Sequence, residues 1–268
     1  MLTMRRLAPP HKGGLPRFLG QLEPRRRWRR CSGSGRMEGA APLRFDVLHL
    51  GLLPLVYYSL PCSDPSVPDG RVVVLLHGLG NTAKDFNQPQ LRNLCRCGRV
   101  VIPSLLGSGG SASPRGAEHY TMPAQARCVL LLLRSLKTKE LFIVGHSMGG
   151  AIALALAEAC AAASEVPLAR CILYSEPNVD SDDCFGSRPG GRPGTDLSTL
   201  TAERAAKVAT CRHLVAESDS GELLGRMQAV RGGSNGSNGL PSLCFIGGKN
   251  KGQLTSEASL LQLGFPVQ

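Results

Sequence analysis

One serine of the sequence has the surroundings that a catalytic nucleophile needs. The segment GHSMGG, residues 145–150, places Ser147 between glycines directly after the apolar run LFIV. A serine hydroxyl is a weak nucleophile until a base removes its proton, and it must also be presented toward a substrate. A sharp turn from a strand into a helix presents it, and Gly145 and Gly149 let the neighbouring chain approach closely. The segment therefore predicts Ser147 as a nucleophile.

A second segment supplies groups that can stabilise negative charge. LHGLG, residues 76–80, follows the apolar run RVVVL. In this arrangement the backbone N–H groups of Leu79 and Met148 are the expected donors to a developing oxyanion. The helix expected after Ser147 also directs its N-terminus at the reacting centre, which favours negative charge there.

The apolar runs around these segments predict an α/β protein. Strands are expected at 43–50, 53–60, 71–77, 99–103, 141–144, 170–175 and 242–246. Helices are expected at 82–95, 122–136, 148–163, 199–229 and 255–263. The first two strands should form a hairpin, and the later alternation predicts right-handed crossovers in a mostly parallel, doubly wound sheet. Residues 180–235 interrupt this alternation as a large insertion.

In these motifs the chain resembles the serine-hydrolase branch of the α/β-hydrolase superfamily over about residues 43–268. VVVLLHGLG matches the strand and oxyanion loop, and GHSMGG the nucleophile turn. PSLLGSGGSASP, residues 103–114, resembles a loop usually written Asp-x-x-Gly-x-Gly-x-Ser, with Ser104 in place of the acid, which we expect to loosen the loop. The resemblance implies this fold with a lid-like insertion, and hydrolysis of an ester or related acyl substrate of the esterase or lipase type through an acyl-enzyme on Ser147.

The catalytic acid has more than one candidate. The family usually places it after the strand before last, where SLCFIGGKN offers Asn250 instead of a carboxylate. Other members place it one strand earlier, and there Glu176 directly follows RCILYS. Glu176 is therefore the preferred acid, with a solvated loop carboxylate as the competing interpretation. Three further carboxylates of that loop are the alternatives: Asp180, Asp182 and Asp183.

The sequence offers no convincing catalytic base. The family order of nucleophile, acid and histidine leaves His213 as the histidine after Ser147, within the helical insertion. His213 fits a surface helix position better than a base. The family's histidine follows a final strand, and the sequence ends at Gln268 where that strand would begin. We therefore expect the last strand and the catalytic histidine to be absent, either from a shortened product of a longer enzyme or from a non-catalytic relative that binds ligands or acts as a scaffold. The sequence as given is then expected to be hydrolytically weak or inactive.

The basic charge is concentrated at the N-terminus. The net charge is +11, but residues 1–36 hold ten Lys and Arg against one acidic residue, so the rest of the chain is nearly neutral. Residues 1–40 are therefore expected to be a basic, disordered arm or a transit-like extension, and residues 41–268 the hydrolase domain. This distribution argues against a nucleic-acid-binding function, and a chain retaining such a leader would be mitochondrial or plastid rather than cytoplasmic.

No cofactor, metal or membrane span is indicated. The cysteines lack zinc-type spacing, and the longest apolar stretch, residues 141–163, contains polar residues and glycines that do not suit a membrane. GSGGSA, residues 107–112, matches a dinucleotide fingerprint but precedes no helix, which argues against NAD. The expected partner is a small acyl substrate, and the oligomeric state is not indicated.

Overall fold

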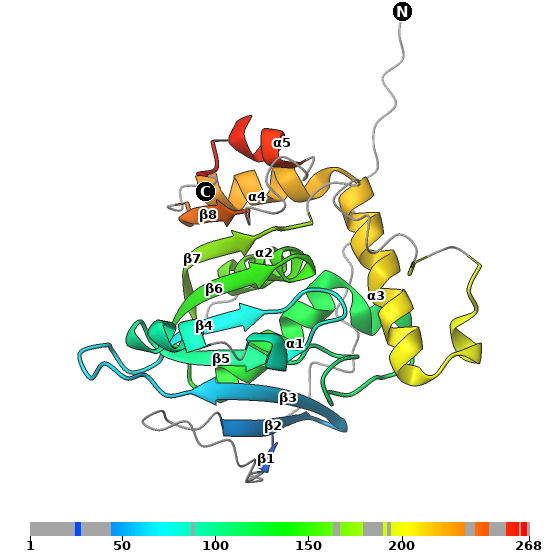
Figure 1. The fold of residues 1–268 in the computed structure, drawn as a ribbon, viewed down its shortest axis with the longest axis horizontal. Coiled ribbons are helices and arrows are strands. Elements are labelled where there is room, and N and C mark those ends of the chain that lie inside the picture. Colours follow the sequence, from blue (N-terminus) through cyan, green and yellow to red (C-terminus); the bar gives the residue numbers. More distant parts are fainter. Residues whose placement is uncertain are drawn as a thin grey trace, which may run out of the picture.

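The computed structural model describes residues 25–27, 44–86, 89–162, 167–178, 190–191, 194–233, 239–246, 256–262 and 264–266. These residues form an eight-stranded sheet with helices packed around it (Figure 1). The strands are β1 (Arg25–Arg27), β2 (Arg44–Leu50), β3 (Leu53–Leu60), β4 (Arg71–Leu76), β5 (Arg99–Pro103), β6 (Glu140–His146), β7 (Leu168–Ser175) and β8 (Ser242–Phe245).

The sheet has the predicted mixture of pairings. Its order is β1-β2-β3-β5-β4-β6-β7-β8. The hairpin of β2 and β3 is antiparallel, and β3 also meets β5 antiparallel. From β5 through β8 every pairing is parallel. The β-branched residues of β4 suit this position, because helices cover both faces of a central parallel strand.

Two α-helices form the core beside the parallel strands. They are α1 (Met122–Ser135) and α2 (Met148–Ala161). α1 begins where predicted, since the Thr121 side chain accepts a hydrogen bond from the N–H of Ala124 and Pro123 occupies the first turn. Nearly all of α2 is buried, and its many alanines let it pack closely on β6, β7 and α1.

The prediction of one continuous helix at 82–95 is wrong in the type of helix. It forms two 3₁₀-helices, η1 (Ala83–Phe86) and η2 (Pro89–Arg96). Asp85 accepts a hydrogen bond from the N–H of Thr82 at 2.6 Å, which starts η1. Pro89 has no N–H to continue an α-helical ladder, which suits its place at the first residue of η2.

The predicted insertion contributes helices beside the carboxyl ends of the parallel strands. They are η4 (Leu197–Thr199), α3 (Ala202–Asp219) and α4 (Glu222–Gly232). Figure 1 shows α3 standing at the arrowhead ends of β4 and β6. Arg226 of α4 forms two hydrogen bonds with Glu158 of α2, at 2.9 and 2.6 Å, which joins the insertion to the core.

The remaining elements lie at the sheet's edges and loops. They are η3 (Ala117–Tyr120), which precedes α1, and α5 (Ser256–Gln262), which follows β8. The strand β1 lies within the predicted basic arm and pairs antiparallel with β2, a contact that the sequence analysis does not anticipate. No helix within the described ranges combines the length and apolar character needed to cross a membrane.

Candidate active site

Ser147 occupies the turn between β6 and α2. Its backbone has φ 53° and ψ −123°, a conformation that few residues with side chains adopt. The turn is held by two hydrogen bonds, from the N–H of Ser147 to the carbonyl of Ser175 and from the N–H of Gly150 to the carbonyl of Ser147. The predicted strand, sharp turn and helix are therefore all present, and the unusual backbone is of the kind that is concentrated at functional sites.

The glycines around Ser147 are required by close packing. A Cβ on Gly145 would collide with the carbonyl of Gly149, and a Cβ on Gly149 would collide with the carbonyl of Leu76 at the end of β4. Both obstacles are backbone atoms, which cannot rotate away. The start of α2 thus lies directly against β4, as the predicted role of the two glycines requires.

The loop after β4 passes beside Ser147. A Cβ on Gly78 would lie 3.1 Å from the Cβ of Ser147. The next residue, Leu79, and Met148 at the start of α2 both line one cavity of about 500 Å³. The structure therefore brings together the two residues whose N–H groups are expected to stabilise an oxyanion.

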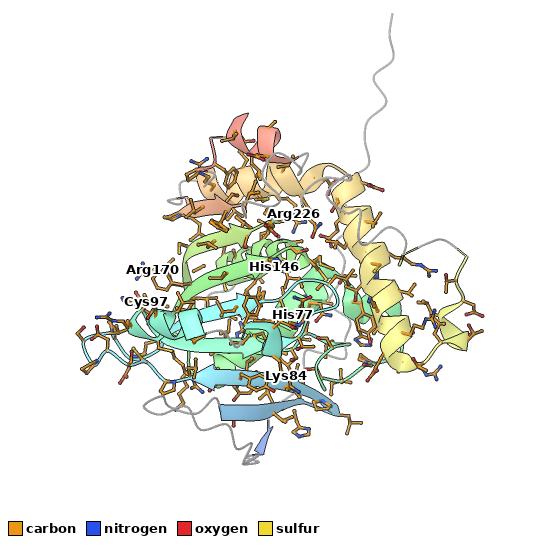
Figure 2. All side chains as sticks on the ribbon, in the orientation of Figure 1. His77, Lys84, Cys97, His146, Arg170 and Arg226 are labelled. Carbon is orange, nitrogen blue, oxygen red and sulfur yellow. The ribbon has the colours of Figure 1, made fainter. Side chains whose placement is uncertain are left out.

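His77 fixes the position of that loop. Its Nε2 accepts a hydrogen bond from the N–H of Leu105 at 3.0 Å, so its Nδ1 carries the proton and donates to the carbonyl of Gly78 at 2.8 Å. The ring is buried, and burial lowers the pKa of His77 below its usual value. His77 and His146 both lie at the carboxyl end of the parallel strands (Figure 2).

Glu176 lies next to the nucleophile turn because β6 and β7 are in register, with His146 opposite Ser175. It has φ 47°, and its N–H donates to the carbonyl of Phe245 at 2.8 Å. Its carboxylate lies 3.7 Å from Nε2 of His146. The preferred acid thus lies in the neighbourhood of Ser147, whereas Asp180, Asp182, Asp183 and Asn250 lie outside the described residues.

Asn178 is a site residue that the sequence analysis misses. Its Oδ1 accepts a hydrogen bond from the hydroxyl of Ser147 at 2.5 Å. Asn178 follows Glu176 by two residues in the loop after β7, and an asparagine in a loop gives no sequence signal of this contact. An amide oxygen accepts a hydrogen bond but does not serve as a base at neutral pH.

His213 is engaged elsewhere. It is half-buried on α3, and its Nε2 lies 2.9 Å from the carbonyl of Ala117. His119 has Glu118 as its neighbour, at 3.7 Å. Within the described part of the chain, no imidazole is hydrogen-bonded to Ser147. No group of three or more metal-binding side chains occurs in the same ranges.

Hydrogen bonds of two serine side chains hold the loop that carries Ser104. The Ser104 hydroxyl accepts a hydrogen bond from the N–H of Ala83 at 3.2 Å. The Ser111 hydroxyl donates to the carbonyl of Ser104 at 2.6 Å and accepts from the N–H of Val56 at 2.9 Å. Two serine hydroxyls thus connect the loop to η1 and β3, and the expected loosening relative to a loop with the usual acid stays a prediction.

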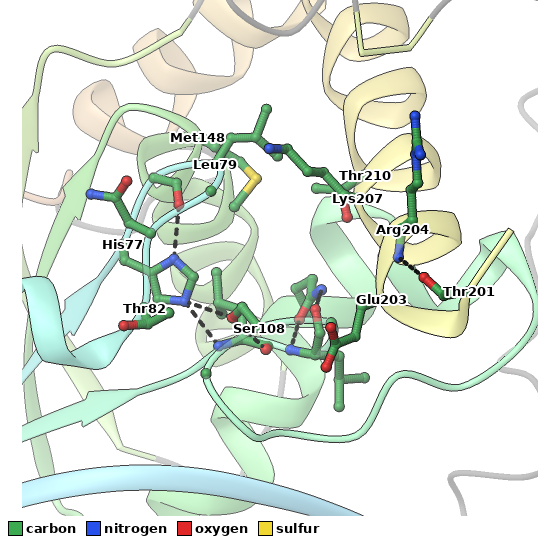
Figure 3. A pocket seen from close by; sticks show the side chains of 18 residues that line it. His77, Leu79, Thr82, Ser108, Met148, Thr201, Glu203, Arg204, Lys207 and Thr210 are labelled. Carbon is green, nitrogen blue, oxygen red and sulfur yellow. Dashed lines mark hydrogen bonds between the residues drawn. The ribbon is translucent and has the colours of Figure 1, made fainter.

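The helix α3 forms the outer wall of the cavity (Figure 3). Its contributing residues are Glu203, Arg204, Lys207 and Thr210. The opposite wall comes from His77, Leu79 and the loop around Ser108. The predicted insertion thus lies over the carboxyl ends of the strands, where the candidate site is.

The chain belongs to the alpha/beta hydrolase family. The model of that family matches residues 73–233, which run from β4 to the end of α4 and include both motifs. The mostly parallel sheet and the strand-turn-helix at Ser147 are in agreement with this membership.

Two bacterial relatives show what kinds of protein share this sequence. The chain is 37% identical over 123 residues to a Variovorax paradoxus (strain S110) protein that bears the name carbamate hydrolase RutD, covering 45% of this chain and 44% of that protein. It is 36% identical over 94 residues to the magnesium-chelatase 30 kDa subunit of Rhodobacter capsulatus, covering 35% and 32%. The matched stretch therefore spans less than half the length of each relative.

A solved structure supports the fold. The proline iminopeptidase-related protein TTHA1809 from Thermus thermophilus superposes with a TM-score of 0.60 at 16% sequence identity. The superposition covers 85% of this chain and 89% of that protein. At this identity the likeness concerns the fold alone.

Proposed function

We propose that the protein is a serine hydrolase that cleaves esters or related acyl compounds through an acyl-enzyme on Ser147. One observation carries the proposal: the strained backbone of Ser147, at the junction of β6 and α2. Such a turn presents the hydroxyl away from the sheet, beside the loop that begins at Gly78. Membership of a family with hydrolase relatives supports the same interpretation.

The proposed mechanism assigns a role to each residue at the site. The Ser147 oxygen attacks the carbonyl carbon of the substrate, its proton passes to a base, and the carbonyl oxygen becomes an oxyanion. The N–H groups of Leu79 and Met148 would donate to that oxyanion, each such donor contributing about 3–4 kcal/mol to the barrier reduction. Collapse of the intermediate expels the alcohol and leaves the acyl group on Ser147, which water then removes.

Glu176 is the proposed acid of this mechanism. A carboxylate beside an imidazole orients the ring and stabilises its protonated form. The 3.7 Å separation of the Glu176 carboxylate and His146 supports a carboxylate that faces an imidazole at this site.

A second candidate function is non-catalytic ligand binding in the same cavity. The observation that favours it is the hydrogen bond from the Ser147 hydroxyl to the amide oxygen of Asn178. A nucleophile needs a base at that place, and an amide cannot take up the proton. The two candidates differ in whether Ser147 turns over an ester.

The experiment that separates them is an esterase assay. Purified protein is assayed with p-nitrophenyl acetate and p-nitrophenyl butyrate, next to Ser147→Ala and to Ser66→Ala, whose serine lies in an exposed loop. The hydrolase proposal expects Ser147→Ala to remove the activity and Ser66→Ala to retain it. Activity that survives Ser147→Ala would contradict the proposed nucleophile, and a protein that binds these esters without turnover would favour the second candidate.

A further inference from the structure

A positively charged side chain of the insertion lines the cavity that also includes Leu79 and Met148. Glu203, Arg204 and Lys207 of α3 line the same cavity as Leu79 and Met148. Figure 3 shows the Lys207 side chain directed toward Leu79 and Met148, whereas the Arg204 side chain runs along α3 away from them. Lys207 is therefore the cation of α3 that faces the expected oxyanion donors.

A distance locates the ammonium group. The Nζ of Lys207 lies 3.8 Å from the position that a Cβ of Gly80 would occupy. Gly80 directly follows Leu79, so the positive charge lies close to one of the two expected oxyanion donors. This proximity places the ammonium where a group attached to the reacting part of a substrate could reach it.

Lys207 has no carboxylate partner within the part of the chain that the structure describes. The ion pairs found there all join other residues. Among the described residues that line the cavity, Glu203 carries the carboxylate, and Asp85 lies on η1 outside that lining. Asp85 is occupied by the N–H and hydroxyl of Thr82, at 2.6 and 3.2 Å. Glu203 lines the cavity and lies toward Ser108 in the view of Figure 3. The Lys207 ammonium group is therefore available in the cavity to pair with a negative charge of a ligand.

We propose that the substrate carries an anionic group, such as a carboxylate, which pairs with Lys207 while the reacting carbonyl lies at Leu79 and Met148. This inference rests on the proposed function for the position of the reacting carbonyl. The N-terminal end of α2 adds to the positive potential, because the helix dipole places partial positive charge at Met148. His77 contributes no charge to this balance at neutral pH, because burial lowers its pKa.

The chemistry of the pair explains the expected preference. An ammonium group that meets a carboxylate in a partly enclosed cavity forms a charge-assisted hydrogen bond, stronger than a bond between neutral groups. A neutral ester of the same size leaves the ammonium to water. Because Lys207 is exposed, solvent screening keeps the effect modest, and we expect a preference of about two- to fivefold for the anionic ligand.

The test measures binding without turnover. All proteins carry Ser147→Ala, and two probes are titrated by calorimetry at pH 7.5 in low salt: monobenzyl glutarate, an anion, and benzyl methyl glutarate, its neutral counterpart. The anionic probe should bind about two- to fivefold more tightly. Lys207→Gln should remove this preference, Lys207→Arg should retain it, and Glu203→Gln should increase it because a repelling carboxylate is lost.

Lys84→Gln is the matched control, because it removes the same charge from an exposed residue of η1 that does not line the cavity. It should leave the preference unchanged. Equal binding of the two probes, binding of neither, or an unchanged preference in a Lys207→Gln protein that melts like its parent would overturn the inference. Every protein in this binding test carries Ser147→Ala, so the test does not depend on turnover. If the unmodified protein shows no esterase activity, the proposed function is contradicted, whereas the binding comparison is unaffected.

Discussion

Ser147 and Glu176 share a backbone feature that connects them to function. Both have positive φ, at 53° and 47°, and the described residues hold one further side-chain residue of this kind, Lys137. Residues other than glycine pay about 1–3 kcal/mol for such a conformation, which persists where surrounding structure enforces it. Here hydrogen bonds to neighbouring strands hold both residues: the N–H of Ser147 donates to the carbonyl of Ser175, and the N–H of Glu176 donates to the carbonyl of Phe245.

A substitution at Glu176 tests its role as the acid. Glu176→Gln keeps the side chain's shape and removes the charge that would stabilise an imidazolium. We expect kcat for p-nitrophenyl butyrate to fall by about 10³-fold or more with little change in KM. Glu118→Gln removes a charge from an exposed carboxylate and should leave kcat unchanged. If Glu176→Gln has the activity of its parent, the acid lies elsewhere, and the loop aspartates are next to be replaced.

A pH titration tests the buried state of His77. Burial lowers its folded-state pKa, whereas an unfolded histidine titrates near 6.5. Below about pH 6.5 the unfolded chain therefore binds a proton that the folded chain does not, so stability is full above that pH and falls as the pH drops toward the folded-state pKa. The free energy of unfolding in urea should decrease by up to about 1.4 kcal/mol per pH unit.

The contribution of His77 to the pH dependence of the free energy of unfolding is obtained by comparing variants. His77→Gln should flatten the pH dependence between 7 and 5, and His119→Gln should keep it. A wild-type protein whose stability is the same at pH 7 and pH 5 after correction for the other groups would contradict the assignment of a neutral, buried His77.

At the scale of elements, local patterns predict much of the fold. Continuous apolar runs predict β4, β5 and β6, and Pro123 with Thr121 marks the start of α1. The failures concern contacts between distant segments. The strand β1 is a run of three arginines whose pairing depends on β2, and Asn178 reaches Ser147 because β6 and β7 align. The local sequence predicts neither contact, because each depends on how distant strands pair.

Two glycine substitutions test the packing of the nucleophile turn. Gly149→Ala would bring a methyl group against the carbonyl of Leu76, so β4 or α2 must shift, at a cost of about 1–3 kcal/mol. We expect the melting temperature to fall by about 3–10 °C. Gly225→Ala is the control, because its Cβ in α4 would meet nothing within 4 Å.

The control should behave in the opposite sense. Alanine is a better helix former than glycine, so Gly225→Ala should raise the melting temperature by about 1–4 °C. Scanning calorimetry of the two variants beside their parent gives both shifts. A Gly149→Ala protein that melts at or above the temperature of its parent would be incompatible with the close approach of α2 to β4.

At the scale of the whole molecule, the described sheet ends at β8. The exposed side chain of Phe245 lies on this strand, with 46% of its surface open to solvent, and the N–H of Cys244 donates to the carbonyl of Pro266. Residues 264–266 thus engage part of the backbone of β8, and the exposed aromatic side chain is what this edge offers as a contact to another chain. We therefore expect the protein to self-associate as its concentration rises.

A charge on that strand should suppress the association. Phe245→Lys places a positive charge at the edge of the sheet, which disfavours association with another chain. Sedimentation velocity should show this variant as a monomer over a range of concentrations. Leu52→Lys adds the same charge at the exposed turn between β2 and β3, where the side chain is 92% exposed, and should associate like its parent. Equal association of both variants would remove β8 as the contact.

The central claim, that Ser147 is the nucleophile of a hydrolase, is tested most directly by covalent labelling. The folded protein is treated with a fluorophosphonate, digested, and the modified residue is located by mass spectrometry. The account predicts an adduct on Ser147 that is absent after heat denaturation and absent in Ser147→Ala, with the remaining serines unmodified. A folded protein that takes up no label at Ser147, or that is labelled equally well after denaturation, would contradict the claim.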